Sequence, residues 1–135
     1  MITVQNTINT SIDKVWDFWT SPEHVINWNT PSAEWHTPHA ENDIKTGGNF
    51  KYKMSAKHNS ESFDFEGVYT NVEKNKVIEY KLFDNRTGTI HFEIIDDKVR
   101  LTEIFEPEKS NPEDMQKEWC QAVIDNFKKY VENFK

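Results

Sequence analysis

The sequence predicts an α+β fold in which a curved antiparallel β-sheet wraps around one long C-terminal α-helix, with two short helices after the first strand. Two patterns indicate this class. Residues 50–105 contain five segments in which apolar and polar side chains alternate, the period of a strand with one buried face. Residues 111–135 instead repeat apolar side chains at steps of three and four, the period of an amphipathic helix. A helix this apolar on one side needs a broad apolar partner, which the sheet is expected to supply.

The length predicts a single domain spanning residues 1–135. A chain of this size buries about two-thirds of the surface that it exposes when unfolded, so the core can hold without disulfides or metals. Aromatic residues make up 13% of the chain, including 5 Trp and 9 Phe. This composition predicts either a bulky core or a pocket lined with rings.

Charge and cysteine content restrict the partners and the compartment. The formal net charge of -7 disfavours nucleic acid and anionic membranes as partners. No apolar stretch approaches the length of a membrane span, so no membrane insertion is expected. Cys120 is the single cysteine, which suits a reducing compartment, and residues 1–10 lack the basic start and apolar run of a signal peptide. The sequence therefore predicts a cytoplasmic location.

The N-terminal third is predicted to contain a strand and a first short helix. Residues 1–9 alternate apolar and polar side chains and read as a strand. Thr10 and Asp13 have the spacing of a capping box, which predicts a helix from Ser11 to about Trp19.

A second short helix and an edge strand are expected to follow. Ser21 is a suitable cap and Pro22 fits the first helical position, so the helix should run to about Trp28. Residues 35–40 are expected to form a short edge strand, because Pro38 cannot donate a hydrogen bond within a central one.

The alternating segments predict five further strands joined by short polar turns, as in an antiparallel meander. Each strand should direct one set of side chains towards the helix. These sets are Phe50, Tyr52 and Met54; Phe63, Phe65, Gly67 and Tyr69; Ile78, Tyr80 and Leu82; Ile90, Phe92 and Ile94; and Val99, Leu101, Glu103 and Phe105.

The C-terminal helix is predicted over residues 111–135, with Asn111 as its cap, Pro112 at the first helical position and Asp114 completing a capping box. Asn126 is the one polar residue within its apolar stripe. The stripe consists of Met115, Trp119, Ala122, Val123, Phe127, Tyr130, Val131 and Phe134.

The aromatic inner face has two interpretations, a ligand pocket and a filled core. Ligand sites are mostly apolar with a few polar groups that set orientation. Glu103 on the sheet and Asn126 on the helix are predicted to point inward, and a buried polar group needs a partner. The two could pair with each other, bind tyrosine hydroxyls or face a ligand. A shift of one residue in strand register would turn Glu103 outward.

Other polar clusters are interpreted as surface features. His36, His39, Glu41 and Asp43 resemble a metal or acid–base cluster, but no HExxH or cysteine partner accompanies them, and Pro38 lies between the histidines. We therefore expect no metal and no cofactor, and interpret this segment as a charged surface loop or a gating loop.

The remaining titratable groups give no catalytic pattern. Cys120 has no histidine at helical spacing, which disfavours a nucleophile. The other candidates are expected to be solvated: the histidines His24, His58 and His91, and the acidic pairs Asp64/Glu66 and Asp96/Asp97.

Four stretches, in order, are similar to a known family: KVWDFWTSPEHVINW, ENDIKTGGNFKYKM, FDFEGVYTNVEKNKVIEY and EWCQAVIDNFKKYVENF. The chain resembles the START-like, or SRPBCC, superfamily with its helix-grip fold. Within it, the chain is similar to bacterial homologues of the C-terminal domain of the heat-shock protein 90 ATPase activator. Two positions depart from the family pattern: Glu118 stands where Gly is frequent, and Asn29 where a second Trp is frequent.

The resemblance implies a cavity between sheet and helix for a small aromatic or lipid-like molecule. The superfamily spans carriers, hormone receptors, polyketide cyclase-like enzymes and chaperone partners, so it implies no single chemistry. We expect a binding protein, because no convergent acid–base pair is evident. The alternatives are a cyclase- or dehydratase-like enzyme using Glu103 or a loop histidine, and a chaperone-interaction module. The expected ligand-binding residues are Trp28, Trp35, Phe50, Tyr52, Phe63, Phe65, Tyr69, Tyr80, Phe92, Glu103, Trp119, Val123, Asn126 and Phe127.

Overall fold

A computed structural model describes residues 1–57 and 61–134. The elements follow the predicted order of strand, two helices, six strands and long helix. They are β1 (Ile2–Ile8), α1 (Ile12–Thr20), α2 (Pro22–Trp28), β2 (Trp35–Asn42), β3 (Asn49–Ala56), β4 (Ser62–Glu73), β5 (Val77–Leu82), β6 (Thr87–Ile95), β7 (Lys98–Phe105) and α3 (Glu113–Asn133).

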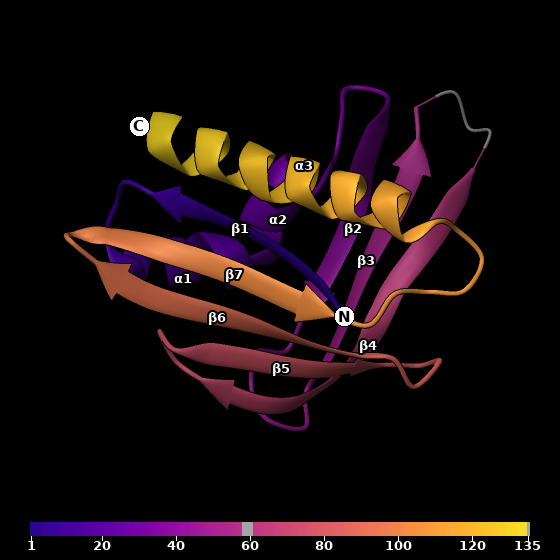
Figure 1. Ribbon diagram of the computed structural model, residues 1–135, viewed down its shortest axis with the longest axis horizontal. Helices are drawn as coiled ribbons and strands as arrows, with labels where there is room; N and C mark the ends of the chain where they lie inside the picture. Colours follow the sequence, from indigo (N-terminus) through magenta and orange to yellow (C-terminus); the bar gives the residue numbers. More distant parts are fainter. Residues whose placement is uncertain (58–60, 135) are drawn as a thin grey trace.

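The strands form one antiparallel sheet in the order β1-β7-β6-β5-β4-β3-β2. The first strand joins the meander by pairing with the last, with Ile2 opposite Phe105 and Ile8 opposite Val99. The sheet curls, α3 crosses its concave side, and on that side α2 packs beside β2 and α1 lies near β6 and β7 (Figure 1). The predicted fold class is therefore confirmed.

Local chemistry explains the turns and the edge. Asn75, Asn85, Asp96 and Asp97 have positive φ values, and they lie in the tight hairpin turns, where Asn and Asp tolerate this conformation. β2 is an edge strand, and its register shifts in the segment that contains Pro38, as expected for a residue that cannot donate to a ladder.

Two predicted caps are wrong. The cap of α1 is Ser11, whose hydroxyl accepts a hydrogen bond from the Lys14 amide at 3.3 Å, so the cap lies one residue after Thr10. At α3, Pro112 occupies the cap position and no side chain caps the helix. The Asn111 side chain is occupied by a hydrogen bond to Glu108 within the preceding loop, and it is not available to the helix. The helix accordingly begins at Glu113.

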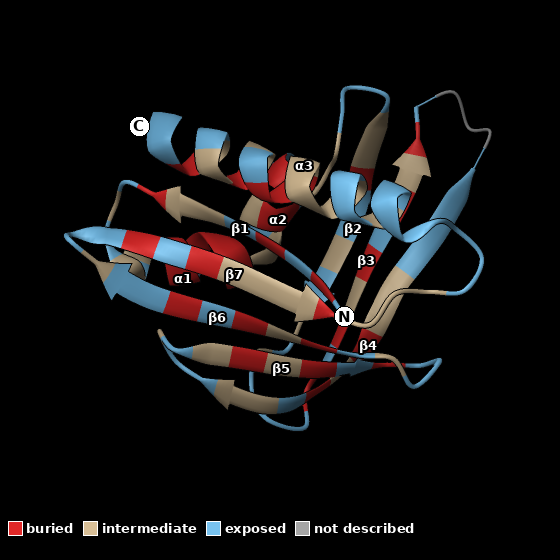
Figure 2. Cartoon of the chain, viewed as in Figure 1, coloured by how far each residue is buried: buried red, intermediate tan, exposed pale blue. Residues whose placement is uncertain are grey.

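The core lies between the concave side of the sheet and the three helices (Figure 2). The buried residues of α3 all belong to its second half: Val123, Ile124, Phe127 and Val131. Its first half is more open, since Met115 is 54% exposed and Trp119 is only partly buried. Four positions predicted to face inward are exposed. They lie at or near the ends of their elements: Phe63 at 46% and Ile94 at 67% on the sheet, and Met115 at 54% and Phe134 at 43% on the helix stripe.

No helix among the described residues combines the length and the apolar character needed to cross a membrane.

Candidate functional site

The expected site residues fall into three groups, of which the first is a closed core. Trp28 is 2% exposed, and its ring packs against that of Phe127 with centroids 4.8 Å apart. Phe92 packs against Trp16 at 5.1 Å, and Val123 is buried beside them in the same core. Trp28 and Phe127 each also pack against Trp19 of α1. This group stabilises the fold and leaves little surface for a ligand.

The second group is an aromatic layer on the sheet. Phe50 packs against Tyr69 with centroids 4.9 Å apart and against Phe65 at 5.5 Å. Phe65 packs in turn against Tyr80 at 5.9 Å, and Tyr52 lies beside Phe50 at 5.8 Å. Four of these rings are buried, whereas Phe65 is only partly buried. The layer therefore has one ring that retains accessible surface.

The third group is a partly exposed aromatic triad formed by Trp35 of β2, Phe63 of β4 and Trp119 of α3. The Trp35 and Trp119 rings meet edge to face at 4.9 Å, and Phe63 lies 5.9 Å from Trp35 and 6.2 Å from Trp119. This triad joins the first half of α3 to the two strands near the sheet edge. All three side chains keep accessible surface where α3 meets these two strands.

Glu103 of β7 points inward, as predicted, and is partly buried among these groups. The Tyr80 hydroxyl donates a hydrogen bond to Glu103 Oε2 at 2.8 Å. Burial raises the pKa of the Glu103 carboxyl, and the Tyr80 hydrogen bond opposes that rise only in part. The pair depends on Gly88, because a Cβ there would lie 2.3 Å from the Tyr80 ring. Of the partners left open by the sequence, a tyrosine hydroxyl is the one observed.

The groups around Glu103 are neutral acids held in their protonated forms. Burial raises the pKa of Tyr52 to about 12, and the nearby Glu103 charge adds to the effect. Burial likewise raises the pKa of the Cys120 thiol, again with a contribution from Glu103. A protonated thiol is a poor nucleophile, which agrees with the interpretation of Cys120 from sequence. The Glu103 carboxyl, the Tyr80 and Tyr52 phenols and the Cys120 thiol lie on β7, β5, β3 and α3, so these four elements meet at this site.

Asn126 satisfies only part of its hydrogen-bonding capacity. Its Nδ2 donates to the Trp28 carbonyl oxygen at 2.9 Å, which fixes the end of α2 to α3. Asn126 Oδ1 and Glu103 Oε1 have no hydrogen-bond partner among the described residues. In the described part of the chain, two side-chain atoms are fully buried without a hydrogen-bond partner, and these are His36 Nδ1 and Asn75 Oδ1. Glu103 and Asn126 are both only partly buried, so each residue keeps some accessible surface.

A series of polar contacts that the sequence did not predict leads from this region to the surface. The Tyr69 hydroxyl lies beside that of Tyr52 and donates a hydrogen bond to Asn42 Oδ1. Asn42 Nδ2 in turn donates to the Thr20 carbonyl oxygen at 2.6 Å. These residues lie on four different elements, so no local sequence spacing could have indicated the contacts.

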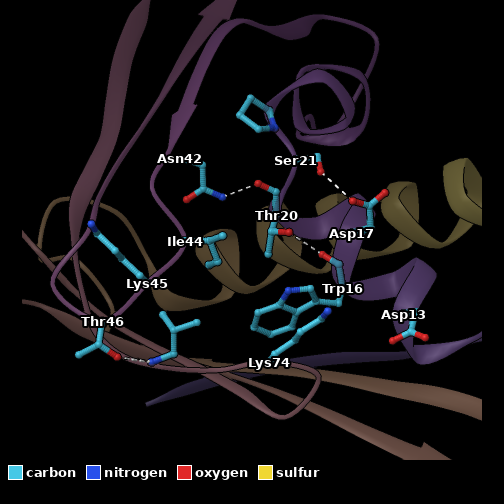
Figure 3. A pocket seen from close by; sticks show the side chains of 12 residues that line it. Asp13, Trp16, Asp17, Thr20, Ser21, Asn42, Ile44, Lys45, Thr46 and Lys74 are labelled. Atoms are coloured by element: carbon cyan, nitrogen blue, oxygen red, sulfur yellow. Dashed lines mark hydrogen bonds between the residues drawn. The ribbon is translucent and has the colours of Figure 1, made fainter.

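A surface groove lies beside Asn42 and Thr20, where this series of polar contacts ends (Figure 3). Its volume is about 800 Å³, and α1 faces the β2–β3 and β4–β5 connections across it. Its lining residues are Asp13, Trp16, Asp17, Thr20, Ser21, Pro22, Asn42, Ile44, Lys45, Thr46, Val72 and Lys74. A second, smaller recess of about 460 Å³ lies outside β2 and β3, next to Phe83. Neither contains Glu103 or any residue of α3, and Phe50, at the second recess, is the one expected ligand-binding residue that lines either of them.

The histidine and acidic segment of β2 does not gather into a metal site. His39 Nε2 lies 3.1 Å from a Glu41 carboxylate oxygen, and both side chains are exposed. Among the residues that the structure describes, no three side chains of the His, Cys, Asp or Glu type come together as a group that could hold a metal ion.

His24 corrects one expectation about the histidines. Its ring is partly buried, stacks on Phe18 with centroids 3.8 Å apart, and its Nδ1 lies 2.9 Å from the Tyr130 hydroxyl. It is therefore a packing residue, not a solvated one. His91 is exposed as predicted, and His58 lies outside the described residues.

Among the acidic pairs, Asp96, Asp97 and Asp64 are exposed as predicted, whereas Glu66 is partly buried. Lys51 lies within 3.8 Å of Asp64 and 3.9 Å of Glu66 on the outer side of the sheet. These pairs contribute surface charge.

Residues 9–132 match the family model described as "Activator of Hsp90 ATPase homolog 1-like protein". The solution structure of Chr148 from Cytophaga hutchinsonii is 45% identical, with a TM-score of 0.85, 98% of this chain covered and 92% of that one. The solution structure of the AHSA1-like protein from Aeromonas hydrophila is 32% identical, with a TM-score of 0.87 and coverages of 97% and 92%. Protein NE0264 from Nitrosomonas europaea, at 16% identity and a TM-score of 0.82 with coverages of 97% and 93%, shares the fold. No curated protein matches the chain.

Proposed function

This chain belongs to the family of activator of Hsp90 ATPase homolog 1-like proteins, and we propose that it binds a small hydrophobic molecule between the sheet and the first half of α3. The single observation that carries the proposal is Glu103 Oε1, an inward-facing acceptor that has no hydrogen-bond partner among the described residues and belongs to a residue that is only partly buried. A packed core normally fills such a position with an aliphatic residue that needs no partner.

The surrounding residues would contribute to binding in different ways. The aromatic layer, with partly exposed Phe65, offers ring contact area, and Glu103 would set the orientation of the ligand. The aromatic triad would form the entrance, because Trp119 and Trp35 retain surface there and Phe63 is 46% exposed. Entry would require the Trp119 ring to move from its edge-to-face contact with Trp35.

A direct test uses N-phenyl-1-naphthylamine, a neutral hydrophobic fluorophore, together with backbone amide NMR. We expect a saturable rise in fluorescence and amide shift changes that cluster at Glu103 and in the first half of α3. Trp119→Ala should weaken binding about tenfold by removing one wall of the entrance. Ile94→Ala, at an exposed apolar position, is the matched control and should leave binding unchanged.

Two results would overturn the proposal. The first is an absence of saturable binding. The second is a set of shift changes confined to the surface groove, at residues such as Thr46 and Lys74, which would place the ligand in the wrong part of the molecule.

The Glu103–Tyr80 pair favours a second candidate, a cyclase- or dehydratase-like enzyme on the same site. A carboxyl whose pKa is raised by apolar surroundings can act as a general acid near neutral pH. Glu103→Gln separates the two functions, because the amide keeps the shape and a hydrogen-bonding group but cannot transfer a proton. An enzyme would lose turnover and keep affinity. A chaperone partner and a cytoplasmic location stay predictions.

A further inference from the structure

The polar atom of the proposed site that is best placed to meet a ligand is an acceptor, Glu103 Oε1 on the sheet. Tyr80 already donates its hydroxyl hydrogen to Glu103 Oε2, which leaves Oε1 without a partner among the described residues. Asn126, further along the helix, donates one of its two Nδ2 hydrogens to the Trp28 carbonyl oxygen. The amide orientation of Asn126 is fixed by its contact, because only the nitrogen can donate to a carbonyl oxygen.

No cation balances the acidic group. Burial and the Tyr80 hydroxyl are the influences that act on Glu103, with no lysine or arginine among them in the described part of the chain. Lys128 of α3 is engaged elsewhere, because its Nζ lies 2.7 Å from the Thr7 carbonyl oxygen and 2.6 Å from Glu132. Arg86, whose charge acts on Tyr80, is paired with Asp84 at 2.6 Å. A buried anion without a cation or several donors is strongly disfavoured.

We infer that this site takes a neutral alcohol or phenol on an aromatic body and rejects carboxylates. The inference rests on the proposed function, since it names the ligand class of the same site. The hydroxyl donates to Glu103 Oε1 when the carboxyl is ionised and accepts from it when the carboxyl is protonated. A ketone fits only the protonated form, and a carboxylate meets a site with free acceptor oxygens and no cation.

The test compares three probes that share one ring system: 2-naphthalenemethanol, 2-methylnaphthalene and 2-naphthoate. Affinities are measured by calorimetry at pH 7.5 on the full chain. The alcohol should bind about fivefold tighter than the hydrocarbon, the scale of one net hydrogen bond. The carboxylate should bind at least about tenfold more weakly than the alcohol, because its charge has no partner.

Variants assign the selectivity to one residue. Glu103→Leu should abolish the preference for the alcohol over the hydrocarbon and keep affinity for both, with its fold checked by amide NMR. Glu103→Gln, the more conservative change, should keep the preference because the amide both donates and accepts. Glu93→Gln, on the exposed face of the neighbouring strand β6, is the control and should behave as the unmodified chain.

The outcomes separate this inference from the proposed function. Binding of 2-naphthoate as tightly as the alcohol, or a preference for the alcohol that survives in Glu103→Leu, would overturn the ligand class and leave the pocket standing. Failure of all three probes to bind would overturn both.

Discussion

The two halves of α3 carry the same apolar periodicity but meet different surroundings. The apolar stripe of the second half is closed, since Ile124, Phe127 and Val131 are 0% exposed. The first half leaves Met115 54% exposed and Trp119 partly buried (Figure 2). The halves also differ in how they are anchored to the sheet.

Polar contacts hold the second half against β1 and the end of that strand. Lys128 reaches the Thr7 carbonyl oxygen at 2.7 Å, and Glu132 accepts from the Asn9 amide at 2.8 Å. The first half bonds through the Gln116 side chain to the loop before the helix, and it reaches the sheet through Gln121, near the middle of the helix, which bonds to the Gln5 backbone of β1. The comparison teaches that one helix can stabilise the fold with one half and leave the other half free to border a ligand.

Truncating one large ring in each half tests this division most strongly. Phe127→Ala should lower the free energy of unfolding by about 3–5 kcal/mol, as for a fully buried aromatic residue. Trp119→Ala should cost about 1–2 kcal/mol, because its ring buries only part of its area. Urea unfolding followed by circular dichroism measures both. Equal losses in the two variants would show that the first half is as closed as the second.

Adding a methyl group at Gly88 tests how closely the Tyr80 ring, the partner of Glu103, packs against this position. Gly88→Ala places a Cβ 2.3 Å from the Tyr80 ring, so the ring must move and the unfolding free energy should fall by about 1–3 kcal/mol. The cost should largely disappear in a Tyr80→Ala background, because the clashing ring is gone. A cost that is the same in both backgrounds would mean that Gly88 is needed for another reason.

The pH dependence of stability gives the smallest and most specific effect. The folded-state pKa of Glu103 is raised above its ordinary value of 4.5, so the folded chain holds this proton more tightly than the unfolded chain. Stability should therefore fall as pH rises from that value through the folded pKa. Glu103→Gln should flatten this part of the profile in thermal melts recorded across pH, whereas exposed Glu93→Gln should not. An unchanged slope in Glu103→Gln would show that Glu103 titrates normally.

The sequence alone determined the order of the elements and the inner face of most strands. Alternation places Phe50, Tyr52 and Tyr80 inside because successive strand side chains point to opposite faces, whatever else surrounds the strand. The same rule placed Glu103 inward. The helical period identified the stripe containing Phe127 and Val131 for the equivalent reason.

Only the tertiary structure decided which inward positions are closed. Phe63 and Trp119 obey the period yet retain exposure, because the distance between α3 and each strand depends on how far the sheet curls. The helix caps also depended on non-local competition, since the Asn111 side chain bonds to Glu108 instead of to the helix.

The partners of the site residues likewise could not be predicted from the sequence. The sequence indicated that Glu103 and Asn126 would need partners, because burial of a polar group is costly in any fold. It could not choose Tyr80 for one and the Trp28 carbonyl for the other, since these partners lie 23 and 98 residues away in the chain. Periodicity is a property of one segment, whereas a partner, a free oxygen and the space beside it arise only where segments meet.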